Sequence, residues 1–546
     1  MGHRARRAVV FACAGLVLAW VWVGGAGAAT VKVCPSGCAF NQIAPAIAAA
    51  SSGDTIQVAA GTYDGGLTVD KSVKLIGAGS GRTTISGGGP VLTIGTFGAA
   101  NEPTVTIDGV TITGGVTRSS PLSTPFFGHE GVFAAGGGVE IPPGADFAVG
   151  AMVSMTNTVV SGNRVAPTET VPSPSGAQCP SGPCPFARAA GGGIDNWGTL
   201  TLTNSTVSNN SLGTAAGLSD VASEAEGAGI HSTIGALTIS NSAISGNRAS
   251  ASAPNGRFAD SGALFLAGGT LTMSNSSVTN NSATLAAGIP SGVNVGVHAG
   301  AIHFGNAQAA TVNNTTISGN AATMTNSVGD AFADSGGLHT DIDVSENSHL
   351  VTLSNDVIAN NHVTSTTVAG SLGNADGSGG AGEISGTMSN LRLSGNTVDV
   401  SAANGDGTGE GGASVFDGGT ITNGAIDDNH VHVASPHGSA SVSGGGIFVA
   451  VGLTLRNTPV TGNTGSASGG SGNALGGGIF DVAFPFGPDG PPGGPLVLQN
   501  SPVTGNVLTG STGLPLQGGG LYLQGEPLTR TNSTIAQNIP DQCFGC

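Results

Sequence analysis

The stretch GGGIFVAVGLTLRNTPVTGN at residues 444–463 decides the fold, because close variants of it recur about eleven times between Gly136 and Asn538. It contains three short runs of alternating or β-branched apolar residues, at 447–449, 453–455 and 458–461. The length and period of these runs predict β-strands. Glycine and asparagine separate the runs, and both tolerate the left-handed backbone conformation that sharp corners require.

A unit of three strands and three corners cannot bury its apolar face alone and must stack on its neighbours. If each unit makes one circuit, equivalent strands pair in parallel with the next circuit, about 4.8 Å along the axis. The repeat therefore predicts an all-β, parallel β-helix in which Ile230, Ile302, Ile447 and Ile479 share one internal file. Because β-crossover-β connections are right-handed, we expect a right-handed solenoid.

The segment before the repeat predicts a different element. Phe40, Ile43 and Ile47 form a helical stripe, and Pro45 is acceptable only in a first turn, so the predicted helix is short. It is well placed to cap the N-terminal end, where strand edges and core side chains would otherwise be exposed. Strands are expected after it at 55–58, 67–69 and 73–76, and irregular circuits through 91–94 and 104–113.

Two parts of the chain resemble known families. The helix followed by GDTIQVAAGTY (53–63) and KSVKLIGAG (71–79) resembles the N-terminal start of right-handed β-helix proteins of the pectin-lyase-like superfamily, including pectin methylesterases. Units with GGGI followed by NSTVSNN (204–210) or NTTISGN (314–320) resemble polymorphic outer-membrane-protein repeats and related exported bacterial β-helix proteins. These resemblances cover nearly all of the mature chain. They imply the architecture and no particular activity.

Residues 1–29 have the features of a secretory signal peptide, because Arg4, Arg6 and Arg7 precede an apolar run at 8–23 and small residues follow. A retained membrane anchor is the weaker alternative. The rest is interpreted as one continuous domain, with the helix and first circuits at 30–135 and the repeat β-helix with one-sided loop insertions at 136–546. The protein is therefore expected to be secreted or held at the extracellular surface, without a membrane span after cleavage.

The net charge is −17, with 15 Lys and Arg against 32 Asp and Glu. Nucleic acid and anionic lipid both require dense positive charge, so this composition argues against them as partners.

The cysteines outside the predicted signal peptide lie in close pairs. Cys34 is near Cys38, Cys179 is near Cys184, and Cys543 is near Cys546. Local disulfides are the natural interpretation in an exported protein, with zinc binding as the alternative and a redox pair as a further one for the last.

Pairs of asparagines mark each unit, from Asn157 and Asn163 to Asn532 and Asn538. They are expected to bond their own backbone and one another along the columns, although Asn204 and Asn314 also begin glycosylation sequons and sugar binding is an alternative. The spacing between units varies mainly after the second asparagine. These insertions, rich in Ala, Ser, Gly and Pro, should emerge along one side of the solenoid as a ragged wall of loops.

The residue after the GGGI-type aliphatic should point outward if that aliphatic points inward. The resulting column is polar in its first half and aromatic at its C-terminal end. It contains Glu140, Asp195, His231, Phe265, His303, His339, Ser385, Phe416, Phe448, Phe480 and Tyr522. Phe416, Phe448, Phe480 and Tyr522 are candidate ligand-binding residues, because a strip of aromatic rings can stack on sugar rings. The alternative is that they stack on each other or are covered by the insertions.

We find no recognisable catalytic, cofactor or metal signature. His303 and His339 together with Asp341 have the spacing of a metal site, but solvated surface histidines are the favoured interpretation. The superfamily's catalytic motifs are not matched: Asp427-Asp428 stands alone, Gly128-His129-Glu130 is the nearest approach to the hydrolase histidine motif, and Arg392 and Arg456 have no matching carboxylate clusters.

The function expected from these observations is that of a secreted or surface-associated adhesin-like or glycan-binding protein, whose partner is an extracellular polysaccharide or another cell-surface protein. The alternative is a divergent polysaccharide lyase or glycoside hydrolase that acts on uronic-acid polymers. A purely structural envelope component is a third hypothesis.

Overall fold

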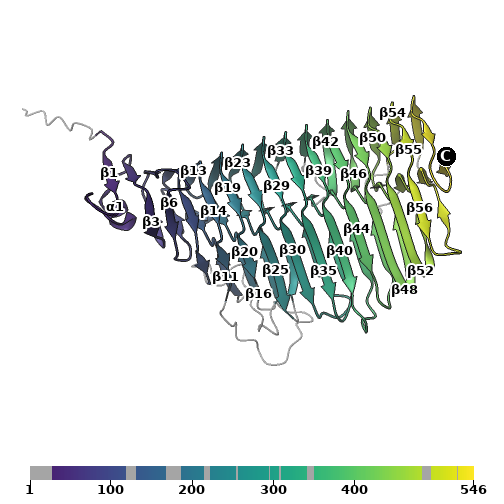
Figure 1. The fold of residues 1–546 in the computed structure, drawn as a ribbon, viewed down its shortest axis with the longest axis horizontal. Coiled ribbons are helices and arrows are strands. Elements are labelled where there is room, and N and C mark those ends of the chain that lie inside the picture. Colours follow the sequence, from purple (N-terminus) through teal and green to yellow (C-terminus); the bar gives the residue numbers. More distant parts are fainter. Residues whose placement is uncertain are drawn as a thin grey trace, which may run out of the picture.

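The computed structural model describes residues 27–118, 131–167, 186–213, 222–253, 256–293, 295–305, 309–340, 350–482, 494–525 and 527–546. These residues form an elongated stack of parallel strands, β1 (Thr30–Val33) to β61 (Cys543–Phe544), with one α-helix and one short 3-10 helix (Figure 1). All of the strand pairs described are parallel, and equivalent strands of successive circuits lie side by side. The prediction of an all-β parallel solenoid is confirmed.

One circuit contributes to three sheets. In a representative circuit, β22 (Ile230–Ser232) and β23 (Ala236–Ser240) belong to a 27-stranded sheet, and β24 (Ala243–Ser245) belongs to a 14-stranded sheet. The strands β25 (Arg248–Ala253) and β26 (Gly256–Asp260) then belong to a 20-stranded sheet. The expected unit of three strands is therefore incomplete, because the insertion contributes two more.

The core runs along the solenoid axis. In the strand register Ile230 pairs with Leu264, and Leu264 pairs with Ile302. Ile447 pairs with Ile479 further along the same file. The aliphatic side chains of this file are fully buried. The predicted internal file is confirmed. The unit quoted first forms β49 (Ile447–Val449), β50 (Leu453–Arg456) and β51 (Val460–Thr461).

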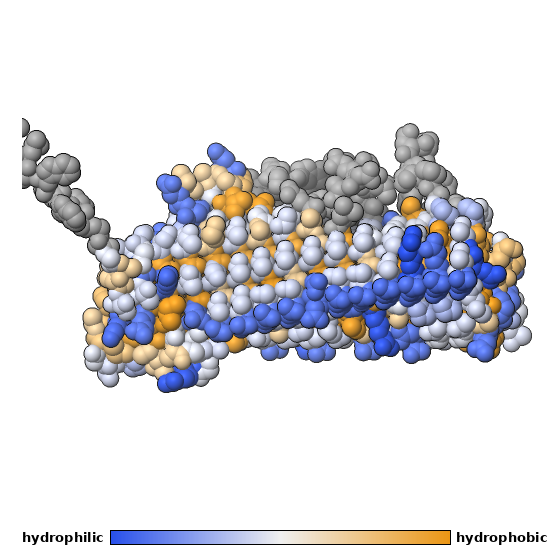
Figure 2. Space-filling model, turned by 90° about the horizontal axis from the view of Figure 1, so that it is seen from above, coloured by the Kyte–Doolittle hydropathy of each residue, from blue (hydrophilic) through white to orange (hydrophobic). Residues whose placement is uncertain are grey.

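The second strand of each circuit builds a flat outer face, which we call the hydroxyl face. Its central outward column is Thr or Ser at eleven of twelve successive positions, so hydroxyl groups repeat with the ladder. These positions are Thr106, Ser154, Thr201, Thr238, Thr272, Thr311, Thr352, Thr387, Thr420, Thr454, Val497 and Thr529. Figure 2 shows pale rows running along this side of the molecule beside a strongly hydrophilic stripe.

The insertions form a second layer of structure, which we call the fin. Outgoing strands such as β25 pack face to face against returning strands such as β26, around a thin core rich in alanine and valine. In β48 (His430–Ser443) and β52 (Thr464–Leu475) one long strand runs out and back along the fin (Figure 1). The described insertions after the second asparagine share the fin and form strands there, so the expectation of loops is wrong for them. Insertions are not confined to that side, because the 3-10 helix Ala145–Phe147 lies between β12 (Val139–Ile141) and β13 (Met152–Thr156).

Close packing explains why the fin is rich in small residues. Gly409, on a returning strand, faces two valines, and a Cβ there would lie 2.6 Å from Val431 Cγ1 and 2.7 Å from Val433 Cγ2. The two layers are therefore close enough that one must present glycine or alanine where the other presents valine. In this segment small apolar residues alternate with polar residues. This alternation has the two-residue period of a β-strand, with the apolar side chains between the two layers and the polar side chains outside.

The asparagine columns form hydrogen-bonded ladders. In the second column, from Asn163 to Asn538, the side chains are almost fully buried. Asn210 is typical, since both its backbone N and its Nδ2 donate to Asn247 Oδ1 at 3.0 Å. In the first column, Asn314 and its equivalents adopt the left-handed conformation, and exposed members such as Asn314 and Asn275 bond each other. The expected ladders are confirmed.

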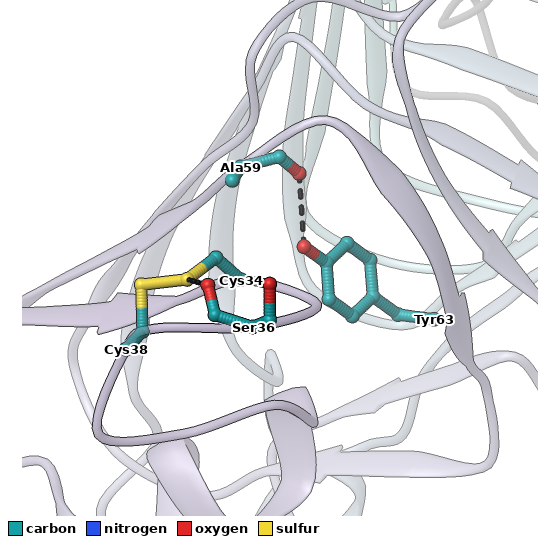
Figure 3. The surroundings of a disulfide bond; sticks show 5 residues. All are labelled: Cys34, Ser36, Cys38, Ala59 and Tyr63. Atoms are coloured by element: carbon teal, nitrogen blue, oxygen red, sulfur yellow. Dashed lines mark hydrogen bonds between the residues drawn. A yellow bond between two sulfur atoms is a disulfide. The ribbon is translucent and has the colours of Figure 1, made fainter.

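The N-terminal circuits contain a short helix near the predicted position and the first disulfide, whereas the capping role expected of the helix stays a prediction. Helix α1 (Ile43–Ala49) buries Ile43, Ala46 and Ile47 against the first turn of the core. Figure 3 shows the Cys34–Cys38 disulfide near Tyr63, whose Oη donates a hydrogen bond to the Ala59 carbonyl at 3.1 Å. The strands β2 (Thr55–Val58), β4 (Leu67–Val69) and β5 (Lys74–Ile76) follow near the predicted positions.

The other predicted disulfides have different outcomes. At the C-terminal end Cys543 and Cys546 are bonded, so this prediction is confirmed. Cys179 and Cys184 both lie outside the described residues. A disulfide between Cys179 and Cys184 is therefore not among the bonds that the structure describes, and it stays a prediction.

Most of the predicted signal peptide also lies outside the described residues and stays a prediction. None of the helices in the described part of the chain is long and apolar enough to span a membrane.

Candidate functional site

The candidate site is a corner that runs along the solenoid where the 27-stranded sheet meets the returning strands of the fin. One wall is the residue column that was predicted to face outward. Strand register gives this column as Glu140, Asp195, His231, Phe265, His303, His339, Glu383, Val415, Phe448, Phe480, Tyr522 and Phe544. The predicted change from polar to aromatic residues is present, but two members of the predicted column are wrong.

Phe416 lies in the solenoid core and is fully buried, so its predicted outward direction is wrong. The file position in its circuit is Ser414, which pairs with Ile447, and Val415 therefore occupies the corner. A register error of one residue reverses the face of a side chain.

Small residues explain the error. Ser414 and Gly382 leave core volume at the usual aliphatic position, and Phe416 and Ile384 fill it from two residues later. Ser385 is likewise replaced in the corner by Glu383.

The C-terminal half of the corner is an aromatic stack. The ring centroids of Phe448 and Phe480 are 5.2 Å apart, those of Phe480 and Tyr522 are 5.3 Å apart, and Tyr522 and Phe544 follow at 5.0 Å. Phe448 and Phe480 are only 4% and 6% exposed. They form an apolar cluster with Leu475, which ends the fin strand β52. Phe448 and Phe480 therefore contact each other and the fin, as the alternative interpretation expected, and offer little surface to a ligand, whereas Tyr522 is half-buried and Phe544 is 40% exposed.

The N-terminal half contains a buried network of charges. On β16 (Phe186–Ala190), Arg188 pairs with Glu226 at the end of β21 (Ala222–Glu226) through Nη2 and through Nε at 2.8 Å. His231 lies beside it, with Nε2 3.4 Å from Glu226 Oε2 and Nδ1 2.6 Å from Asp195 Oδ1. Trp197 Nε1 donates to the other oxygen of Asp195 at 3.1 Å. This first cluster is a chain of matched charges.

Neighbouring charges shift the pKa values of Glu226 and His231 in the directions that favour their ionised forms. Burial raises the pKa of Glu226, but the Arg188 guanidinium and His231 outweigh burial and lower that pKa to about 2. Burial lowers the pKa of His231, but hydrogen bonds with Asp195 and Glu226 reverse this and leave the pKa raised. Each charge therefore depends on its neighbours.

A second cluster follows along the corner. Phe265 stacks on His231 with ring centroids 5.6 Å apart, and Phe265 and His303 form a T-shaped contact with centroids 4.9 Å apart. His303 and His339 are in edge contact at 4.8 Å, and both are buried. They are not the solvated surface histidines that we expected. Asp341, their predicted partner, lies outside the described residues.

The fin supplies the partners of these histidines. His298 lies on β31 (Gly296–Ala299), and Asp334 ends β36 (Ala331–Asp334). Asp334 places Oδ2 3.4 Å from His298 Nδ1 and Oδ1 3.2 Å from His339 Nδ1. Asp260, at the end of β26, lies 4.0 Å from His303 Nδ1. Two carboxylates and three imidazoles therefore lie together in the corner, and of these the His298 side chain is the most exposed, at 24%.

The pKa values in this second cluster diverge. Burial raises the pKa of Asp334, yet His339 and His298 lower it to about 2. Burial lowers the pKa of His298, yet Asp334 and Asp260 raise it to about 9. Burial raises the pKa of Asp260 to about 7 and that of Glu383, which is also near Asp417, to about 8. Clusters of shifted pKa values are typical of functional sites.

Sequence reasoning found His231, His303 and His339 but missed the partners Glu226, Asp334 and His298. A signal was present, because an acid immediately before the glycine-rich turn precedes the corner histidine by five residues, both from Glu226 to His231 and from Asp334 to His339. This five-residue spacing predicts a contact only if the acid ends a β-strand, because a strand fixes the direction of its side chains. We interpreted the insertions as loops, so the spacing could not be used.

The remaining candidates are not brought together. Asp427 forms an exposed ion pair with Arg392 at 2.6 Å, and His430 lies on the fin, with Nδ1 2.6 Å from Thr464 Oγ1. His129 lies outside the described residues. No protein-family model matches the chain, and comparisons with curated proteins and with solved structures give no significant match.

Proposed function

We propose that the chain is an exported, elongated binding protein that recognises an uncharged extracellular polysaccharide on its hydroxyl face. One observation carries this proposal: the Thr and Ser column continues from Thr106 to Thr529 with a single interruption, at Val497. Isolated surface threonines are ordinary on β-strands, which favour this residue. A column of hydroxyl side chains across the circuits from Thr106 to Thr529, five of them exposed and six half-buried, is a stronger feature.

The chemistry of the face suits a neutral polymer of sugars. A hydroxyl group both donates and accepts hydrogen bonds, as do the hydroxyls of a sugar. Each such bond contributes only about 1 kcal/mol in water. The ladder repeats them every ~4.8 Å, so an extended chain can make many equivalent contacts, and their sum supports useful avidity.

Charge selects among polysaccharides. The net charge is −17, and the central column holds no ionisable residue between Thr106 and Thr529. Polyanions are repelled by such a protein, so a neutral polymer is favoured over a uronic-acid polymer. The resemblance to exported β-helix proteins of the pectin-lyase-like superfamily, with repeats like those of polymorphic outer-membrane proteins, supports the same setting outside the cell.

The aromatic residues have a different role in this proposal from the one expected at first. Phe416 belongs to the core, and Phe448 and Phe480 are buried in the corner. Tyr522 is half-buried near the C-terminal end of the stack. They stabilise the ladder that presents the hydroxyl face, and the polysaccharide contacts threonine and serine.

The alternative function, cleavage of uronic-acid polymers, has one observation in its favour, the cluster of groups with shifted pKa values around His339. Against it, Asp260, Asp334 and His303 are buried, so a polymer backbone does not reach them in this arrangement. The negative net charge also opposes an acidic substrate. We therefore favour binding.

The test compares two sets of three consecutive threonines. In the first variant Thr272, Thr311 and Thr352 on the hydroxyl face become Val, which keeps side-chain shape and removes three hydroxyls. The control variant makes the same change at Thr284, Thr323 and Thr364 on the outer side of the fin.

Binding is measured on cellulose, chitin and mannan, with polygalacturonate and alginate as acidic polymers. We expect wild type and control to bind a neutral polymer, and the first variant to bind at least about tenfold more weakly. Equal loss in both variants, or binding by neither the variants nor wild type, would overturn the proposal. Release of unsaturated uronides or reducing ends would favour the enzyme alternative instead.

A further inference from the structure

We infer that His298, Asp334 and His339 form a binding site for one divalent first-row transition-metal ion, for which zinc is the natural probe. The three residues come from three neighbouring strands, β31, β36 and β37 (Leu338–Thr340). One ligand atom from each lies within 4.8 Å of the other two. The site is independent of the hydroxyl face, since it lies in the corner.

The donor set fits such an ion. Two imidazoles and one carboxylate are typical ligands of zinc and of other borderline divalent metals, whereas calcium and magnesium prefer oxygen alone. Ligand atoms about 2.0–2.2 Å from a common zinc ion lie roughly 3–4 Å from one another. The two oxygens of Asp334 each lie at such a distance from one imidazole, Oδ2 at 3.4 Å from His298 Nδ1 and Oδ1 at 3.2 Å from His339 Nδ1, so the carboxylate faces both rings.

The orientation of these groups also favours a shared ion. Within the part of the chain that the structure describes, Asp334 Oδ1 and His298 Nδ1 are buried and make no hydrogen bond of acceptable geometry. Each nevertheless has a partner of opposite charge within 3.4 Å. Asp334 is 2% exposed, so bulk water does not satisfy it. Close contact without alignment is expected of ligands that point toward a common centre instead of toward each other.

The first cluster of the corner provides an internal contrast. There the permanent cation Arg188 donates from Nε to Glu226 at 2.8 Å, and the hydrogen bond between His231 and Asp195 is 2.6 Å long. Around Asp334 the described residues include no Arg or Lys ion pair. A bound cation would supply there the charge that Arg188 supplies in the first cluster.

Another group is placed to complete the coordination. Glu383 Oε2 lies 3.7 Å from His339 Nδ1, the nitrogen that also faces Asp334, and the Ser335 hydroxyl lies 3.1 Å from the same nitrogen. A bound ion would replace the contact between this nitrogen and Ser335, since a ring nitrogen that binds a metal accepts no other hydrogen bond. The His298 side chain is 24% exposed, which gives an ion access from solvent.

The experiment uses the full chain without a polyhistidine tag, dialysed against chelator and then titrated with zinc. We expect one equivalent to bind, and cobalt added in its place to give visible absorption bands of nitrogen and oxygen ligation. His298→Gln and Asp334→Asn should each weaken binding more than about 100-fold, because losing even a group that only orients a ligand costs about 10–100-fold. The control is His362→Gln, which removes a histidine near Asp399 on the fin and should bind like wild type.

A second measurement guards against variants that fail to fold. Zinc added to wild type should slow amide hydrogen exchange in β31, β36 and β37 and leave β49 and β53 (Ile479–Val482) unchanged. Failure of wild type to bind a stoichiometric ion would overturn the inference. So would equal binding by the His298 and His362 variants when circular dichroism shows both folded, or protection that lies elsewhere in the chain.

Discussion

The two halves of the corner are built from the same parallel strand arrangement but contain chemically different side chains. In the N-terminal half, Arg188, Glu226 and His231 form a buried network of charges, whereas in the C-terminal half Phe448, Phe480 and Tyr522 form a stack of rings. In both halves the fin contributes the facing residue, which is Glu226 or Asp334 in one and Leu475 in the other. The comparison shows that the parallel strands accept either charged or aromatic side chains in the corner, provided that each side chain contacts a compatible one in the next circuit.

The physical cost of the two solutions differs. Burying a charge is unfavourable unless its partners are present, so the charged half depends on each member. Burying an aromatic ring is favourable by itself and gains about 0.5–1.5 kcal/mol more from each stacked neighbour. We therefore regard the aromatic half as a structural element, and the charged half as the part of the corner that carries chemistry.

The largest effect is expected from Arg188→Met, which leaves Glu226 buried beside fewer positive charges. Breaking a buried pair costs about 3–5 kcal/mol. Because repeat solenoids can unfold locally, we would measure hydrogen exchange in β21 and β22 and the fluorescence of Trp197, which contacts Asp195. The control is Arg392→Met, whose ion pair with Asp427 is exposed and should contribute less than about 1 kcal/mol.

If the two arginine variants lose equal protection, the charged half does not depend on its partners and the comparison fails. The double variant Arg188→Met with Glu226→Gln should recover part of the loss, since it removes both charges together.

A somewhat smaller effect is expected from Phe480→Ala in the aromatic half. The variant removes a ring that is 6% exposed between Phe448 and Tyr522 and should cost about 3 kcal/mol, the lower end of the range for truncation of a buried phenylalanine. Exchange should increase in β49, β53 and β58 (Leu521–Gln524), while Trp197 fluorescence stays unchanged. Phe480→Leu keeps most of the volume and should lose less. Loss of protection around Trp197 would contradict the independence of the halves.

The smallest effect, on the order of 2 kcal/mol, is expected from acidification of the wild-type protein. The folded-state pKa of Glu226, about 2, lies below its ordinary value of 4.5, so its contribution is fully present above pH 4.5 and is lost as the pH falls toward 2. The groups that act on Glu226 are Arg188 and His231, with Asp195 and Glu224 nearby.

Denaturant titrations at about pH 5 and about pH 2.5, on either side of the window set by these pKa values, would test this. The Trp197 signal should show the loss, and exchange in β49 and β53, corrected for its intrinsic pH dependence, should change less. An equal change in both halves would mean that the acid sensitivity has another source.

Much of the fold was predictable because its determinants are local. The alternation in residues 447–449 and 453–455 specifies which side chains point inward, and glycine and asparagine specify the corners between strands. The buried asparagine ladder followed from the same repeat, since a residue that recurs at one corner must meet its copy in the next circuit.

Proximity in sequence also predicted the disulfides that the structure describes. Cys34 bonds Cys38 across four residues, and Cys543 bonds Cys546 across three. The same argument applies to Cys179 and Cys184. Both lie outside the described residues, so that bond is neither confirmed nor contradicted.

Two features were not predictable in this way. The register at Ser414 and Gly382 depends on the volume that neighbouring circuits leave in the core, which the pattern of one segment does not contain. The fin depends on insertions of different lengths finding a common two-layer packing, as Gly409 does beneath Val431 and Val433.

By itself, the sequence determined that the chain coils into stacked parallel circuits with an apolar interior, because strand period and corner residues act over a few positions. Only the tertiary structure decided what fills the corner. Arg188, Glu226 and His231 meet across circuits, and Asp334 reaches His298 and His339 from the end of a fin strand. Such contacts depend on how far each insertion extends before it returns, and this is a property of packing between circuits.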